Sequence, residues 1–492
     1  MSLQRIIKSG VLGSWLVSVS LTSAQGATTF KPDCVTQLQR EMDAIATQPL
    51  FNKARLGIFI QPLDSTQPLY TRDAERYFLP ASTTKVMTTA AALQRLGPQF
   101  QIQTDVLAAG QGSTLDHLRV VGRGDPSLSD QHLKQVAAQL QKQGVRQINR
   151  LLGDDTYFRG SKVIPSWQWE DLQAGYGAPI NSLILNQNAY ELKLWPQTPG
   201  QPLRVEWLSP KPIGAWRQIN RTRTVAKGAP EYVEIKRRLQ GSTLEIEITG
   251  QLQVGAPPDR SAVAVVNPGW FLLHRFRTIL ATHQIKVGQM SLLTNEQERN
   301  AALKNKSEQR LTQIQSPPLS TLVVTTNQES NNLYAEALLK TLGATAPSQA
   351  TQSTTHQQGL TTLQKILTQL GVDRTTYDLA DGSGLSRHNL ISPTALVQTL
   401  QTILRSPHKS VFQASLSQRS VGKNPASTVF SKSGGMQGVS TLSGYLQQTQ
   451  SPSIVFSLMF NQYNQSSAQR RQAMNAMLLS MHRLQSCQTG SQ

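Results

Sequence analysis

The sequence predicts an α+β protein whose main domain is interrupted by a long insertion. Alternating apolar residues predict a strand at 56–63, and an alanine-rich run predicts a buried helix at 82–96. Two more strand-like runs, at 440–448 and 453–463, lie around a turn near the end of the chain and precede a helix over about 468–484. Strands that follow one another beside long helices favour an α+β domain over a parallel sheet.

Between residues 99 and 262 the pattern changes to short strands, glycine turns and proline-rich stretches, which indicate an inserted region with its own fold or folds. Helical periodicity returns after Val266, so we assign 27–98 and 263–492 to the main domain. The polar stretch at 296–317 is expected to be a loop. A chain of 492 residues exceeds the usual size of a single core, which agrees with two or three domains.

The first residues are typical of a cleaved secretory signal over 1–26. Arg5 and Lys8 precede an apolar stretch at 11–21 that is too short to span a bilayer, and small residues follow it. We therefore expect a secreted protein without a membrane anchor. The two cysteines, Cys34 and Cys487, are expected to pair because the compartment is oxidising.

The net charge of +19 favours anionic surroundings, such as cell-wall polymers or lipid headgroups at a membrane surface. Nucleic acid is the competing partner class, but the sequence shows no basic stripe with interleaved aromatic residues, and the secretion signal argues against it. A generally basic, well-solvated surface without a specific partner explains the charge equally well.

The first candidate for chemistry is the pair Ser82 and Lys85, at the start of the predicted buried helix. The same spacing recurs at Ser406 and Ser420, and a serine at a helix start is often only an N-cap. Only Ser82 opens a long apolar helix, which places Lys85 on the same face as the hydroxyl. A lysine there can act as a base if burial and a neighbouring positive charge lower its pKa.

Two downstream triplets could supply that positive charge and a proton path. One contains Ser330 and Asn332 before a predicted helix, and the other is Lys432, Ser433 and Gly434 after a strand-like stretch. Taken singly, the first could be a polar cap and the second an ordinary turn. In this order and together with the serine and lysine above, they match the motif set of penicillin-binding proteins and class A β-lactamases.

The chain resembles the class C low-molecular-mass penicillin-binding proteins, which are D-alanyl-D-alanine carboxypeptidases and endopeptidases. The likeness also includes "FLPASTTK", "GRGDPSL", "DGSGLSRHNLISP" and the wide spacing between Ser82 and Ser330. It implies a penicillin-binding/β-lactamase-like domain, an antiparallel sheet flanked by helices. It further implies two nested, mainly-β accessory domains within 99–262, the inner one at about 117–190. Ser433 departs from the threonine usual in the family but keeps the hydroxyl.

The resemblance also implies the role of each motif residue. Ser82 would be the nucleophile and Lys85 its base, with the backbone N–H groups of Ser82 and Gly435 at the oxyanion. The remaining catalytic and substrate-binding residues would be Ser330, Asn332, Lys432, Ser433, Gly434, Arg387, Asp171, Tyr176 and Gln437. Asp171 could equally be a surface carboxylate. The glycine at 435, where a bulkier residue could sit, is expected to loosen the strand edge.

As substrates the resemblance implies peptidoglycan stem peptides, with β-lactam antibiotics as covalent inhibitors, on the far side of the bacterial cytoplasmic membrane in the periplasm or cell wall. The eight histidines form no zinc-peptidase motif, so we expect no metal and no cofactor. Two alternatives remain. A serine β-lactamase would share the motifs but release the penicilloyl group quickly, whereas a non-catalytic wall-binding protein would form no covalent penicillin adduct.

Overall fold

The computed structural model describes residues 30–304, 306–346, 353–423, 426–448, 451–485 and 487. The signal expected at 1–26 lies outside these residues. No helix within them is long and apolar enough to cross a membrane.

A six-stranded antiparallel sheet forms the centre of the main domain, in the order β16-β17-β18-β19-β1-β2. Its strands come from both ends of the chain: β1 (Arg55–Pro62), β2 (Tyr70–Arg72), β16 (Ser417–Val421), β17 (Ser427–Met436), β18 (Val439–Gln447) and β19 (Ile454–Asn461). Successive residues of β1 enter different cores, because Ile58 packs on one face of the sheet and Phe59 on the other. The three strands predicted from alternation are neighbours here as β18, β19 and β1.

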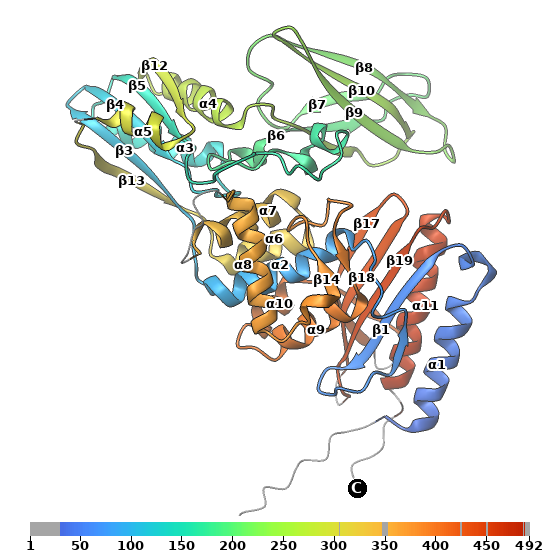
Figure 1. Ribbon diagram of the computed structural model, residues 1–492. Coiled ribbons are helices and arrows are strands. Elements are labelled where there is room, and N and C mark those ends of the chain that lie inside the picture. Colours follow the sequence, from blue (N-terminus) through green and yellow to red (C-terminus); the bar gives the residue numbers. More distant parts are fainter. Residues whose placement is uncertain are drawn as a thin grey trace, which may run out of the picture.

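Helices cover both faces of this sheet (Figure 1). On one face α1 (Pro32–Ala46) packs beside α11 (Ser467–Gln485). The structure joins Cys34 to Cys487 in a disulfide with 6.3 Å between the two Cα atoms, as expected from the sequence. On the other face lie α2 (Thr84–Leu96), α6 (Leu319–Gln328), α7 (Asn332–Ala344), α8 (Thr355–Gln369), α9 (Pro393–Leu404) and α10 (Lys409–Ser415).

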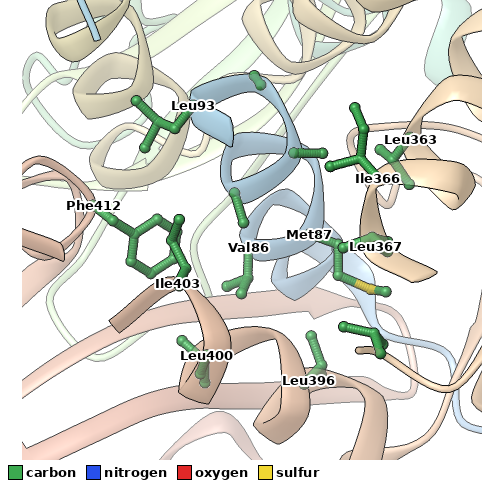
Figure 2. Close-up of a cluster of buried hydrophobic side chains, with 14 of the residues drawn as sticks. Val86, Met87, Leu93, Leu363, Ile366, Leu367, Leu396, Leu400, Ile403 and Phe412 are labelled. Atoms are coloured by element: carbon green, nitrogen blue, oxygen red, sulfur yellow. The ribbon is translucent and has the colours of Figure 1, made fainter. Parts of the chain in front are cut away.

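Helix α2 is the centre of this second layer. Its side chains from Thr84 to Leu93 are all buried, because the helix is surrounded by other helices rather than packed on one side only. Figure 2 shows Val86 and Met87 of α2 close to Leu367 of α8 and Leu396 of α9. The start of α2 is thereby held in a fixed place against the sheet.

The inserted region is built around a five-stranded sheet in the order β12-β5-β4-β3-β13. The strands are β3 (Gln103–Gln111), β4 (Thr114–Val121), β5 (Gln147–Asp154), β12 (Lys286–Leu293) and β13 (Gln309–Gln315). Helices α3 (Asp130–Lys142) and α4 (Pro268–Thr282) pack on it, and α5 (Glu296–Leu303) precedes β13. Because of these helices, this part is not mainly β as the resemblance implied.

Two three-stranded sheets are nested between β5 and α4 (Figure 1). One has the order β11-β6-β7 and the other β8-β10-β9. Their strands are β6 (Ala189–Trp195), β7 (Arg204–Trp207), β8 (Trp216–Val225), β9 (Tyr232–Gln240), β10 (Thr243–Gln253) and β11 (Asp259–Ala264). Ile248 of β10 and Leu272 of α4 belong to the same core, so the nested sheets and the outer sheet stabilise each other.

Two expected boundaries differ from the structure. The inserted region continues beyond 263 to Gln315, since β12 pairs with β5 and β13 pairs with β3. The inner part spans 189–264 rather than about 117–190. The periodicity after Val266 is that of a real helix, α4, but periodicity does not reveal which sheet a helix covers. The loop expected at 296–317 is also wrong: Asn295 caps α5 by accepting the N–H of Glu298, and β13 follows.

Candidate active site

Ser82 lies in a single 3₁₀ turn, Ala81–Thr83, that leads directly into α2. The N-cap residue of α2 is Thr83 rather than Ser82, so the N-cap interpretation is wrong. Ala81 has a φ of +48°, a conformation that costs a non-glycine residue free energy and points to a special role for the turn. One turn further on, the Lys85 amine lies 2.9 Å from the Ser82 hydroxyl oxygen.

The Lys85 side chain is completely buried. Burial lowers the pKa of its amine to about 7, and the positive charge of Lys432 acts in the same direction. The negative charge of Asp381 opposes this shift. A lysine with a pKa near 7 is partly neutral at neutral pH, as a general base must be.

The second triplet, Ser330 to Asn332, contacts Lys85 from the start of α7. Ser330 has a φ of +57°, and the Asn331 side chain caps α7 by accepting the N–H of Tyr334. Asn332, the first residue of α7, accepts a hydrogen bond from the Lys85 amine through Oδ1 at 2.7 Å. The strained backbone at Ser330 is the second such residue at the site, which indicates that the chain is held there for function.

The third triplet completes the cluster from β17. Lys432 is buried, and its amine donates to the hydroxyl of Ser330 at 2.9 Å and to the carbonyl of Ser433 at 2.7 Å. Burial lowers the pKa of Lys432 to about 8. A Cβ added at Gly434 would lie 2.8 Å from the backbone nitrogen of Ser82. Only glycine therefore lets β17 approach the Ser82 turn this closely.

The edge of β17 next to this cluster is open. Strand β16 pairs with β17 only from 427 to 431, so residues 432–436 have no partner on that side among the described strands. Ser433 and Gly435 are exposed there, and a Cβ at Gly435 would meet nothing within 4 Å. An open strand edge of this kind can bind an extended peptide by main-chain hydrogen bonds. Its pairing with β18 is regular through 436, so Gly435 does not loosen the strand.

The residues matched only by resemblance line the mouth of the site. The Tyr176 hydroxyl donates to Asp171 at 3.2 Å. Arg387 donates to the carbonyl of Gln437 at 3.2 Å and to the side chain of Gln168 at 3.3 Å, which links the inserted region to the β17–β18 turn. Burial raises the pKa of Asp171, although the Tyr176 hydrogen bond and the charge of Arg387 lower it. The structure thus brings these residues together.

The sequence predicted an active-site loop at 381–387, but not its contact with the catalytic lysine. The carbonyl of Ser383 accepts a hydrogen bond from the Lys85 amine at 2.7 Å. The carboxylate of Asp381 accepts the N–H groups of Gly384 and Ser386 and that of the Trp167 indole. The glycine-rich pattern marked a loop, but no signal in the sequence marked a main-chain carbonyl as a contact of the base.

The described residues contain no group of three or more His, Cys, Asp or Glu side chains that could hold a metal ion. The chemistry of the cluster described above is that of an activated serine. The cluster can support acyl transfer. It combines a hydroxyl with a buried amine whose pKa is lowered, and it adds a second hydroxyl beside a second lysine and an open strand edge.

Comparison with known proteins gives the same result. The model of the D-Ala-D-Ala carboxypeptidase 3 (S13) family matches residues 38–483. A "D-alanyl-D-alanine carboxypeptidase" of Actinomadura sp. is 31% identical over 454 residues, which are 87% of this chain and 81% of that protein. "D-alanyl-D-alanine carboxypeptidase DacB" of Haemophilus influenzae is 26% identical over 472 residues, 93% of each chain.

Among solved structures, penicillin binding protein 4 from Haemophilus influenzae has a TM-score of 0.72 and 23% sequence identity, covering 91% of this chain and 98% of that one. This similarity confirms the α+β fold of the main domain. The family match begins within α1 and ends within α11, and so includes the cluster around Ser82. The protein is therefore a member of the D-Ala-D-Ala carboxypeptidase 3 (S13) family.

Proposed function

We propose that the protein hydrolyses the terminal D-alanyl-D-alanine bond of peptidoglycan stem peptides through an acyl-enzyme at Ser82, and cleaves the corresponding cross-links as an endopeptidase. The observation that carries this proposal is the contact of the buried Lys85 amine with both the Ser82 hydroxyl and Asn332. The family match and the carboxypeptidase relatives support the same substrate class.

In the first step neutral Lys85 takes the proton of the Ser82 hydroxyl while the oxygen attacks the carbonyl carbon between the two D-alanines. The negative charge on the carbonyl oxygen is stabilised by the backbone N–H groups of Ser82 and Gly435. The close approach of Gly434 to the backbone nitrogen of Ser82 supports this assignment, since it holds the strand beside the turn.

The C–N bond then breaks and D-alanine leaves as an amine that must gain a proton. Ser330 relays to this amine the proton that Lys85 took from Ser82, which leaves Lys85 neutral again, and a hydrogen bond of 2.9 Å to Lys432 holds the Ser330 hydroxyl. Lys432 and Ser433 bind the terminal carboxylate of the substrate, while the open edge of β17 pairs with its backbone. Water finally attacks the ester while Lys85 takes its proton, and Lys85 returns that proton to the Ser82 oxygen as the ester bond breaks and the shortened peptide leaves.

The specificity of the site is assigned to its mouth. Asp171 of the inserted region would bind the free amine of the diamino acid side chain in the stem peptide, with Tyr176 beside it. Arg387 and Gln437 would contact the substrate near the β17–β18 turn. A cationic partner would favour the ionised form of Asp171, whose pKa burial raises.

A β-lactam is expected to acylate the same serine, and the Haemophilus influenzae protein has been solved in complex with a β-lactam. After incubation with penicillin, peptide mapping should place the adduct on the peptide that contains Ser82. Ser82→Ala should abolish it, whereas Ser406→Ala and Ser420→Ala, which alter the other serines with a lysine three positions on, should not. An adduct at either control serine would contradict the assignment.

The same experiment separates the two alternatives. Hydrolysis of the penicilloyl adduct within seconds would indicate a β-lactamase, and no adduct at all would indicate a non-catalytic wall-binding protein. Release of D-alanine from a monomeric muropeptide, and of two monomers from a cross-linked one, measures the balance between carboxypeptidase and endopeptidase. The signal peptide, the periplasm or cell wall as location, and contact of the basic surface with an anionic membrane or wall polymer remain predictions.

A further inference from the structure

Behind the catalytic cluster lies a carboxyl group to which the mechanism above gives no role. Glu336 is on α7, one turn after Asn332, and its side chain is completely buried. Its nearest basic group is the Nδ1 atom of His356, 4.0 Å from Glu336 Oε2. Burial of a carboxyl group is costly unless its hydrogen-bonding capacity is used. The contacts of the second carboxyl oxygen, Oε1, therefore indicate the role of Glu336.

The Oε1 atom of Glu336 accepts two consecutive backbone N–H groups, those of Gly382 at 2.9 Å and Ser383 at 2.8 Å. The opposite side of the same loop is also held, because the Thr88 hydroxyl donates to the carbonyl of Gly382 at 2.7 Å. The next residue, Gly384, has a φ of +82° and packs against the Ala81 carbonyl. The loop is thus fixed between α7 and the turn that carries the nucleophile.

The carbonyl of Ser383, which this loop positions, decides how the base is oriented. A neutral lysine amine has two N–H donors and one lone pair. Two of its three neighbours, Asn332 Oδ1 and the Ser383 carbonyl, can only accept hydrogen bonds, and each is 2.7 Å away. They take both N–H groups, so the lone pair of Lys85 points at the third neighbour, the Ser82 hydroxyl.

The orientation of Asn332 is fixed in the same way. Its amide nitrogen donates to the carbonyl of Tyr176 at 3.0 Å, and a carbonyl accepts only. The amide oxygen must therefore face Lys85. One acceptor of the base is set by the inserted region through Tyr176, and the other is set by Glu336 through the backbone of Ser383.

We propose that Glu336 is a positioning residue for the general base: it fixes the Ser383 carbonyl, which turns the Lys85 lone pair toward the Ser82 hydroxyl. This inference rests on the proposed function and deepens it. Glu336 touches neither substrate nor the reacting atoms, and its effect passes through two backbone N–H groups.

The groups that face Glu336 indicate that it acts without a charge. Lys85, Lys340, His356 and Asp381 surround it, and burial together with the charge of Asp381 raises the pKa of Glu336 to about 8. The Nε2 atom of His356 faces the carbonyl of Ala380 at 3.0 Å, so in the neutral ring it carries the hydrogen. Its Nδ1 atom then carries the lone pair, 4.0 Å from Glu336 Oε2, and makes no hydrogen bond to it.

An uncharged acceptor of the same shape should therefore replace Glu336. In Glu336→Gln the amide oxygen can still accept both N–H groups, and the rate constant of acylation by saturating penicillin should stay near the wild-type value. In Glu336→Ala the loop loses its anchor, and the same rate constant should fall by at least about tenfold, because a small misplacement of a catalytic group is costly. The concentration of penicillin needed for half-saturation should change little.

Asp155→Ala is the matched control. Asp155 is also a buried carboxylate that accepts two consecutive backbone N–H groups, those of Ser182 and Leu183, but it lies in the inserted region away from Lys85. It should lower the unfolding temperature without changing the acylation rate constant of the folded enzyme. Rates are measured per folded protein, below the unfolding transition of each variant.

Wild-type acylation in Glu336→Ala would overturn the proposal, as would a Glu336→Gln that is as slow as Glu336→Ala. If Glu336→Ala does not fold, Glu336→Asp takes its place, because the shorter side chain cannot reach both N–H groups. It should be slower than Glu336→Gln, and a wild-type rate would overturn the proposal. Failure of wild type to form an adduct at Ser82 would instead contradict the proposed function.

Discussion

The main domain and the nested sheets differ in where they place their charged side chains. In the main domain, the side chains of Lys85, Glu336 and Lys340 are almost completely buried. On the sheet β8-β10-β9, Arg217 and Arg221 pair with glutamates while more than half of each arginine side chain stays exposed. In these pairs the glutamate side chains are mostly buried but the arginines stay in water, whereas the buried charges of the main domain are held in one place at a high cost.

This difference indicates that the two regions contribute differently to the active site. The main domain supplies the catalytic side chains with their shifted pKa values, and the inserted region contributes a few contacts to the main-domain residues around them. The carbonyl of Tyr176 and the indole of Trp167 are two such contacts, to Asn332 and Asp381. Substitutions in the main domain should therefore change the rate of the chemical step, and substitutions in the inserted region should change the choice of substrate.

The largest effect is expected from the base. Lys85→Met should lower the rate constant of penicillin acylation by about 10²–10⁴-fold, the usual contribution of a general base. Lys340→Met is the control, since Lys340 is equally buried and donates to the carbonyls of Ser161 and Ile180 rather than to the nucleophile. It should destabilise the fold and leave acylation near wild type. Similar losses in both variants would mean that burial, not position, explains the result.

The disulfide tests whether stability and chemistry can be separated within the main domain. The double variant Cys34→Ser, Cys487→Ser should lower the free energy of unfolding by about 3–5 kcal/mol, because the bond closes a very long loop in the unfolded chain. Acylation below the unfolding transition should be unchanged, since α1 and α11 lie on the face of the sheet opposite α2. Titration of two free thiols in unfolded, unreduced wild type would contradict the pairing.

Asp171 tests the contribution of the inserted region. Asp171→Ala should weaken kcat/KM for stem peptides with a free side-chain amine by roughly 1.5–3 kcal/mol, the value of a charged hydrogen bond. Amine-blocked peptides and penicillin lack that cation and should react at nearly wild-type rates. Equal losses on all three substrates would mean that Asp171 only supports the fold, and the inserted region would then lose its role in substrate choice.

The smallest effect is expected in the pH dependence of kcat/KM. The base must be neutral, so kcat/KM should rise as pH passes the Lys85 pKa of about 7. Lys432 must be charged to bind the carboxylate, so kcat/KM should fall above its pKa of about 8. The result is a bell-shaped profile. Lys432→Arg should move the descending limb to higher pH, because a guanidinium stays charged. An unchanged limb would exclude Lys432 as its source.

Much of the site could be predicted from the sequence because its residue types are demanded by the chemistry. Ser82 and Lys85 are neighbours on one helix, and the triplets at Ser330 and Lys432 each keep their order. Glu336 could not be found in this way. In the sequence it is one more glutamate in a helix, and its burial depends on a loop almost fifty residues away. Contacts to backbone atoms leave no pattern in the residue types.

The extent of the inserted region was missed for a related reason. Strand pairing between β5 and β12, or between β3 and β13, joins segments far apart in the chain. Alternation and periodicity are local, so they identify a helix such as α4 but not the sheet that it covers. The inner part was likewise predicted too early in the chain. The short strands at 103–154 and those at 189–264 have the same sequence pattern of short apolar runs and turns.

The topology of the main sheet also sets the order in which the protein can mature. Ile58 of β1 pairs with Leu458 of β19, so the N-terminal strand waits without this partner until nearly all of the chain has been made. The inserted strands β3, β4 and β5 follow one another closely and can assemble earlier. Lys432 reaches the Ser82 turn only when β17 joins the sheet. A nascent chain therefore lacks the finished catalytic cluster until β17, β18 and β19 have been made and have joined the sheet.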